Sequence, residues 1–213
     1  MFVLKYDLEI FFLIIISTAV FFAVNNHKNQ LNIATPIPKF VTADTAVPTP
    51  TSSPKPYEET VSWQSSDGNE KIAMKTQYIK KTAKTYSFFV SKTGENTDTP
   101  LFYETADSET SFSIPFNTFS PDDKYLFLKE DKKGENHYLV FNSSGLPFAN
   151  QEKYIDITPL FDKYTSNYIL SKVTGWASDT LLIIETKNMN GSPSTSFWFD
   201  VTTQSFTPLA TRF

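Results

Sequence analysis

Hydrophobic and polar positions divide this chain into three zones. An uncharged apolar run covers residues 10–24, and a stretch rich in Pro, Thr and Ser covers residues 35–56. From residue 57 onward, short apolar runs alternate with clusters of Gly, Asn, Asp and Ser. This order predicts an N-terminal signal anchor with its flanks (1–34), a Pro/Thr-rich linker (35–56) and one folded domain (57–213).

The apolar run predicts a single membrane-spanning helix. About 15 helical residues span roughly 22 Å, and flanking residues from Lys5 onward extend the helix toward the ~30 Å of a bilayer core. One alternative is a cleaved signal peptide, although a cut after Ala19 leaves an apolar mature start. Another is a buried helix of the domain, which the linker disfavours. The anchor residues are Ile10, Phe11, Phe12, Leu13, Ile14, Ile15, Ile16, Val20, Phe21, Phe22 and Val24.

The orientation of this anchor rests on weaker signals. Lys5 precedes the run and Lys28 follows it, so the positive-inside rule gives nearly a tie. The N-terminal tail is very short, and the linker prolines exclude helix and central strand, which leaves a spacer of at most roughly 70 Å. We therefore expect a single-pass protein of the cell membrane, anchored in the lipid bilayer, with its C-terminal domain outside the cytoplasm.

The pattern after residue 56 predicts an all-β domain. Aromatic residues make up 15% of the chain and only 6 residues are Gly, while the apolar runs are short and rich in β-branched and aromatic side chains. One short helical turn is expected after Pro159. The strands expected in pairs are 71–79 with 85–92, 124–131 with 137–144, and 180–187 with 196–203.

These strand pairs belong to a weak internal repeat. Each pair follows an aromatic residue and a Ser/Asp turn, and the lead aromatics lie about 56 and about 57 residues apart. In such turns an Asp side chain accepts hydrogen bonds from nearby backbone amides, so we interpret these acids as turn formers rather than metal ligands. The lead aromatics and turn acids are Trp63, Asp67, Phe119, Asp122, Asp123, Trp176 and Asp179.

The expected strands are apolar on both faces. Tyr125 and Phe127 alternate with Leu126 and Leu128, and residues 181–184 are apolar throughout. A sheet with one wet face would alternate apolar and polar residues. The pattern therefore predicts sheets stacked face to face, as in the neighbouring blades of a propeller or the layers of a β-sandwich.

The segment FSPDDKYLFL (119–128) resembles the opening of WD40-like repeats in TolB and in the propellers of prolyl-oligopeptidase-type peptidases. Segments 176–184 and 196–204 are similar to one blade of that family, and the resemblance covers roughly residues 61–209. It implies a β-propeller that binds partners or gates an attached hydrolase. About three units are too few to close a propeller of 4 to 8 blades. We therefore expect a partial propeller-like stack with an apolar terminal face that pairs with itself or with a protein partner; a β-sandwich is the alternative.

Composition removes several kinds of chemistry from consideration. The chain has no Cys, which excludes disulfides, thiolate metal sites and a lipoprotein anchor. The domain carries a net charge of roughly −5, which gives no general attraction for nucleic acid. Of the two histidines, His27 lies next to the anchor and His137 in an expected strand. No nucleophile elbow, zinc-protease pair or phosphate loop occurs, so we expect no catalytic residue, no metal and no cofactor.

The expected function is that of a membrane-anchored, extracytoplasmic interaction module for a protein or other ligand, rather than an enzyme. Trp63, Trp176 and Trp198 form either an aromatic surface for carbohydrate or peptide, or part of the core. A structural, pilin-like envelope subunit is one alternative, motivated by Glu9 ahead of an apolar helix. A glycan-acting hydrolase is another, and it rests only on paired acids.

Overall fold

The computed structural model describes residues 57–80, 82–95 and 97–210. They belong to one compact unit, Ser52–Phe213. The expected anchor (10–24) and linker (35–56) lie outside the described residues. Within the described part of the chain, no helix has the length and apolar character needed to cross a membrane.

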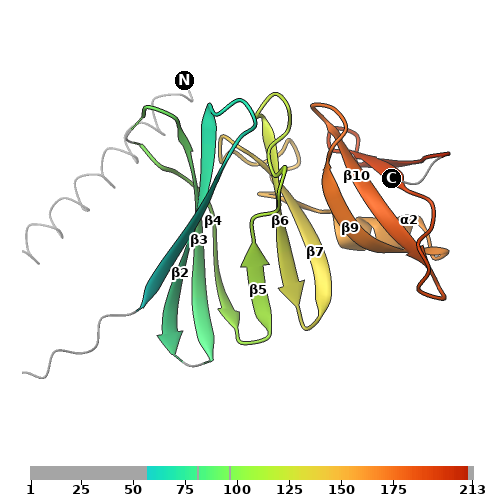
Figure 1. Cartoon of the computed structure of the whole chain (residues 1–213), viewed down its shortest axis with the longest axis horizontal. Coiled ribbons are helices and arrows are strands. Elements are labelled where there is room, and N and C mark those ends of the chain that lie inside the picture. The colour runs from blue at the N-terminus through green and yellow to red at the C-terminus, as the bar shows by residue number, and fades with distance from the viewer. Residues whose placement is uncertain (1–56, 81, 96, 211–213) are drawn as a thin grey trace, which may run out of the picture. The chain divides into compact units, whose positions relative to one another are not determined.

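The domain consists of three four-stranded antiparallel sheets and one short helix (Figure 1). Each sheet is formed by strands consecutive in the chain, in the orders β1-β2-β3-β4, β5-β6-β7-β8 and β12-β11-β10-β9. The prediction of a β domain is confirmed. The strands are β1 (Glu58–Gln64), β2 (Glu70–Lys80), β3 (Ala83–Lys92), β4 (Thr99–Asp107), β5 (Thr110–Ser113), β6 (Tyr125–Lys132), β7 (Glu135–Asn142), β8 (Ile155–Asp156), β9 (Tyr168–Trp176), β10 (Leu181–Asn188), β11 (Phe197–Asp200) and β12 (Ser205–Pro208).

The middle sheet packs on both of its neighbours. Leu126 and Leu128 belong to a core shared with the first sheet, whereas Phe127, between them in β6, belongs to a core shared with the third. Figure 1 shows the three sheets in a row in chain order. The face-to-face stacking predicted from strands apolar on both faces is therefore confirmed for the second sheet. A two-layer sandwich has two sheets, whereas this domain has three.

The outer face of the first sheet differs from the prediction. On β2 the residues turned away from the second sheet include Lys71, Lys75 and Gln77, and on β3 they include Ser87 and Ser91. The Lys75 ammonium lies 5.0 Å from the centre of the Phe89 ring and shields it. This face mixes polar residues with Ala73, Phe89 and Tyr103, so the first sheet has no continuous apolar terminal face of the kind expected for an open fan.

The helix α2 (Ile157–Tyr164) begins two residues before the expected Pro159. Pro159 lies in the first turn, where its missing N–H costs no intrahelical bond. Asp156 caps the helix by accepting a hydrogen bond from the Thr158 amide. Ile157 and Phe161 are buried in the core between the second and third sheets, so the helix fills space that the strands leave open.

Candidate binding groove

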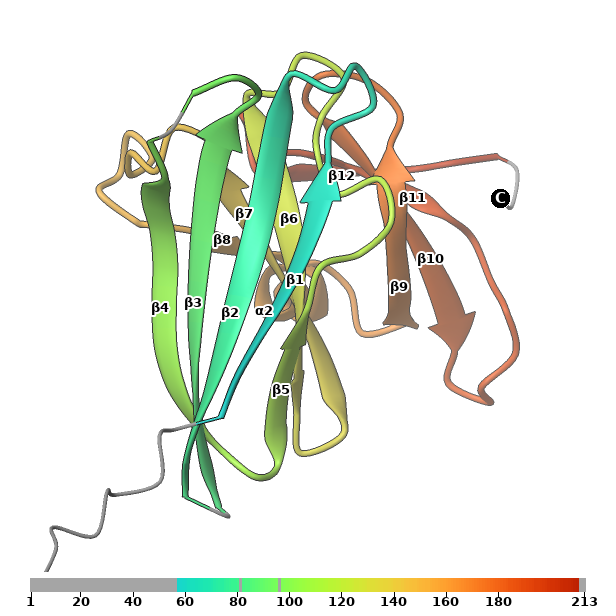
Figure 2. The same ribbon diagram turned by 60° about the vertical axis from the view of Figure 1, so that its left-hand side comes forward.

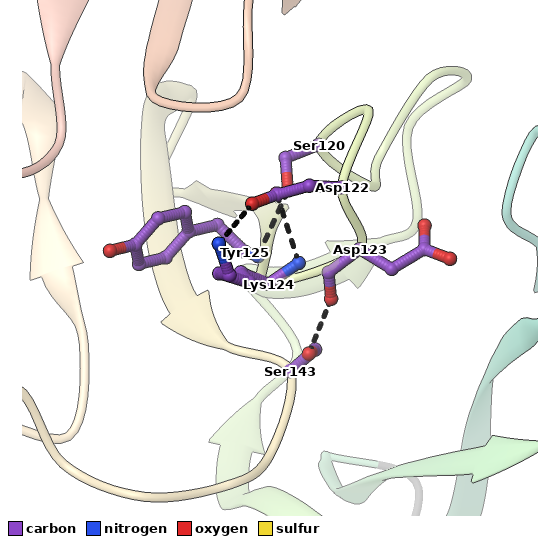
Figure 3. Close-up of polar contacts among 6 residues, drawn as sticks. All are labelled: Ser120, Asp122, Asp123, Lys124, Tyr125 and Ser143. Carbon is purple, nitrogen blue, oxygen red and sulfur yellow. Dashed lines mark hydrogen bonds and ion pairs between the residues drawn. The ribbon is translucent and has the colours of Figure 1, made fainter.

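Two turns at the same end of the first and second sheets have the same hydrogen bonds. The Ser65 hydroxyl donates to the Asp67 carboxylate (2.7 Å) and accepts from the Glu70 amide (3.0 Å). In the second sheet the Ser120 hydroxyl donates to the Asp122 carboxylate (2.8 Å) and accepts from the Tyr125 amide (3.0 Å), as Figure 3 shows. In each turn the serine hydroxyl thus accepts a hydrogen bond that a backbone carbonyl would accept in a regular strand pair, at the point where the chain reverses.

The residue after the acid has a left-handed backbone in both turns. It is Gly68 in the first (φ 76°) and Asp123 in the second (φ 56°). Asp tolerates this region better than most residues with a side chain. The third turn differs: Ala177 occupies the serine position, and its amide bonds to the Leu181 carbonyl (2.7 Å), so the turn around Asp179 is one residue shorter.

These bonds correct the alignment of the lead aromatics. Phe119 directly precedes its turn serine and Trp176 directly precedes Ala177, but Trp63 comes two residues before Ser65. Gln64 therefore occupies the position of Phe119, and Trp63 corresponds to Thr118. Trp63 pairs with Ile72, so its ring lies on the face toward the second sheet.

The carboxyl groups of Asp67 and Asp123 meet between the first two turns. Burial and a hydrogen bond with Asp67 raise the pKa of Asp123 to about 6. The backbone amide of Asn69 and the hydroxyl of Ser65 lower the pKa of Asp67, so Asp67 holds the negative charge of the pair. The Ser143 hydroxyl donates to the Asp123 carbonyl (2.5 Å), and Figure 3 shows the Asp123 carboxyl directed away from Asp122.

Beside these turns lies a groove of about 390 Å³. Its most accessible rings belong to Trp63, 43% exposed, and Phe116, 70% exposed. The two rings meet edge to face with their centres 5.6 Å apart. We call this site the aromatic groove; it is lined by Trp63, Gln64, Ser65, Ser66, Phe116, Asn117, Thr118, Phe119, Pro121 and Trp176.

The third sheet contributes the back of the aromatic groove. The indole Nε1 of Trp176 donates to the Thr118 carbonyl (3.0 Å). Gly175, next to it in β9, has φ 145°, and a Cβ at this position would lie 3.1 Å from the Cβ of Asn117. The glycine therefore allows β9 to approach the Asn117 side chain closely, and residues from all three sheets or their turns meet in one place.

The lining of the aromatic groove is polar but uncharged. The hydroxyl of Ser66 and the amide of Asn117 belong to lining residues, and none of the lining residues is ionisable at neutral pH. Nowhere among the described residues do three or more His, Asp or Glu side chains form an arrangement that could hold a metal ion. The groove is suited to stacking and hydrogen bonding with a neutral ligand.

His137, expected in a strand, makes a structural contact. Its Nδ1 lies 2.8 Å from the Asp156 carboxylate, whose other oxygen accepts from the Thr158 amide at the start of α2. The pair joins β7 to the β8–α2 junction, away from the lining of the aromatic groove.

The structure gathers the three expected lead aromatics, Trp63, Phe119 and Trp176, along the aromatic groove. Asp67 and Asp123 pair with each other outside the lining of the groove, and Asp122 accepts its hydrogen bonds within its own turn. Trp198 lies in β11 and does not line the groove. Phe116 and Asn117 were not predicted. The sequence signal that could have found them is an aromatic residue directly after Pro115, outside any expected strand.

Comparison with known proteins gives no family for this chain: no family model, no curated protein and no solved structure matches it.

Proposed function

We propose that this protein is a membrane-anchored, extracytoplasmic interaction module with a propeller-like domain, and that it binds its ligand in the aromatic groove. The observation that carries the proposal is the exposed Trp63–Phe116 ring pair in an uncharged groove of about 390 Å³. A ligand that covers aromatic rings at a concave site removes their apolar surface from water, and this favours binding.

The polar part of the lining supports binding rather than a reaction. Orienting a ligand needs a few fixed donors and acceptors, which the lining residues Asn117 and Ser66 can supply. General acid–base or nucleophilic catalysis needs an ionisable or activated group at the site. The TolB-like sequence of the second turn and the three stacked sheets support the propeller-like description, and the apolar run at 10–24 supports the anchor.

Two screens of the full-length chain test the proposal, one with a random heptapeptide display library and one with an oligosaccharide array. We expect at least one ligand whose binding weakens tenfold or more in Trp63→Ala and in Phe116→Ala. Tyr103→Ala is the matched control, because Tyr103 is about as exposed (65%) as Phe116 (70%) but lies on β4 outside the groove. The absence of any ligand, or binding that ignores both groove substitutions, would refute the proposal.

A further inference from the structure

We propose that the ligand of the aromatic groove is an extended polypeptide segment that adds to the first sheet as a strand beside β1. This inference rests on the proposed function and names the ligand class. The strand β1 is the outermost strand of its sheet in Figure 2, and it is exposed at all seven positions, Glu58–Gln64.

The hydrogen-bond register of β1 shows which backbone groups are free. The Ser65 amide bonds to the Glu70 carbonyl and the Tyr78 amide to the Tyr57 carbonyl. Bonded pairs alternate along an antiparallel ladder, so odd-numbered residues of β1 point their amides and carbonyls at β2. The amides and carbonyls of Glu58, Thr60, Ser62 and Gln64 therefore point away from β2, and the described residues supply no strand partner for them.

Every other sheet edge in the described part of the chain is short or interrupted. The strands β5, β8 and β12 have four, two and four residues. The longer β4 contains Pro100 and a register shift, and β9 contains two shifts. Proteins commonly protect sheet edges by such devices, because a regular free edge recruits another strand. The seven-residue β1 pairs with β2 without a register shift, so it is the edge left open.

The side chains of β1 connect this edge to the aromatic groove. Val61 and Trp63 pair with Met74 and Ile72, so they lie on the face toward the second sheet, where Phe116 meets Trp63. Val61 and Trp63 are 44% and 43% exposed. A strand added beside β1 would place alternate side chains against these residues and its end in the groove.

The exposed side chains of β1 define which residues the bound polypeptide segment needs. Its residues opposite Val61 and Trp63 are apolar, and uncharged residues enter the aromatic groove. A basic residue near Glu58 and Glu59 meets the acidic start of β1. A segment of about seven residues covers the edge.

A second copy of this chain fits the edge less well. If β1 paired antiparallel with itself over residues 60–64, Val61 would lie opposite Trp63, but only part of the strand would pair. The register of full overlap, seven residues, would set Glu59 opposite Trp63. A carboxylate would then lie against an exposed apolar side chain beside an uncharged groove. A different polypeptide with an apolar residue at that position avoids this cost.

The test uses the full-length chain, peptides from the random heptapeptide library, and Ser62→Pro. The Ser62 amide points away from β2, so proline removes a donor of the free edge and no bond of the β1–β2 ladder. Ser62→Val keeps the amide and is the matched control. We expect peptides with alternating apolar residues to bind wild type and Ser62→Val alike, and to bind Ser62→Pro at least tenfold more weakly.

Amide hydrogen exchange of the wild-type chain tests the same claim without a substitution. Peptide should slow the exchange of the Thr60, Ser62 and Gln64 amides, while the Val61 and Trp63 amides are already protected by β2. Peptide binding that depends on Trp63 but not on the Ser62 amide would overturn strand addition and leave the proposed function standing. Binding of oligosaccharides alone would do the same. A dimer that dissociates in Ser62→Pro would assign the edge to a second copy, and no binding in either screen would refute both proposals.

Discussion

The indole Nε1 of Trp176 donates a hydrogen bond of 3.0 Å to the backbone carbonyl of Thr118, two residues before the turn serine Ser120 of the second sheet. The Trp176 ring also stacks on Tyr125, with ring centres 6.3 Å apart, and meets Phe127 edge-on. One side chain of β9 thus joins the third sheet to the segment that carries Phe116 and Asn117. The position of the aromatic groove depends on this junction.

Replacing Trp176 by Phe should destabilise the domain by about 1–2 kcal/mol, because it removes the hydrogen bond and part of the ring contact. The loss is limited because the Thr118 carbonyl still accepts from the Phe127 amide (3.0 Å). Trp198→Phe is the control: the buried Nε1 of Trp198 has no partner, so its loss should cost less. Urea unfolding of both variants makes the comparison, and equal costs would contradict the role of the Thr118 bond.

Ser120→Ala and Ser65→Ala should each cost about 1–2 kcal/mol of unfolding free energy. Each substitution removes a hydroxyl that accepts from a strand amide and donates to a turn carboxylate. Both serines are buried, at 0% and 6% exposure, so water does not replace the lost bonds. Chemical denaturation should give similar losses; a neutral effect at one site would show that the two turns are not energetically equivalent.

Asp123 makes the stability of the domain depend on pH. Its folded pKa of about 6 lies above the ordinary Asp value, so the folded state favours the protonated form. This contribution is fully present below about pH 4 and is lost as the pH rises through about 6. Nearby, burial raises the pKa of Glu70, whose Oε2 has no hydrogen-bond partner, and this shift acts in the same direction.

Asp123→Asn should therefore stabilise the domain at pH 7.5, by on the order of 1 kcal/mol after allowance for solvent screening, and have little effect near pH 4. Asp122→Asn is the control with the opposite sign. Burial acts to raise the pKa of Asp122, but hydrogen bonds from Lys124 and Ser120 outweigh it, and the pKa is lowered. Removing this carboxylate should therefore destabilise the domain at neutral pH and less in acid. Unfolding free energies of both variants, measured between pH 4 and pH 7.5, test this prediction. An Asp123→Asn effect that does not change with pH would contradict it.

Gly175→Ala should reduce both stability and ligand binding. The added Cβ meets Asn117 at 3.1 Å and the backbone at φ 145° disfavours a side chain, at a cost of about 1–3 kcal/mol. Gly191→Ala controls for the backbone: φ is 80°, but a Cβ there meets nothing within 4 Å. Thermal unfolding should show a larger loss at Gly175, and an equal loss would mean that the Asn117 contact adds nothing.

The sequence predicted the two inner strands of each sheet and missed the edge strands. The strands β2, β3, β6, β7 and β10 agree with the expected ranges within a few residues, because their side chains fill the two cores. By contrast, β1 is exposed at every position, so neither alternation nor a continuous run marks it. The one-residue offset of Trp63 depends on which residue supplies the turn hydroxyl, and spacing alone does not reveal this.

The aromatic groove was only half predictable. The tryptophans were recognised as a candidate surface, but their burial depends on which face of a strand meets the next sheet. Phe116 lies in the loop after β5 and meets Trp63, a long-range contact with no local signal in the sequence. The pairing of Asp67 with Asp123 likewise joins residues 56 positions apart in sequence.

The indole N–H resonances of the full-length chain test the central claim most directly. The chain has 3 tryptophans, and each gives one signal in a ¹H–¹⁵N spectrum. On addition of the tightest-binding peptide or oligosaccharide from the two screens, the signals of Trp63 and Trp176 should shift while that of Trp198 stays in place. A shift confined to Trp198, or none in the three, would contradict binding in the aromatic groove.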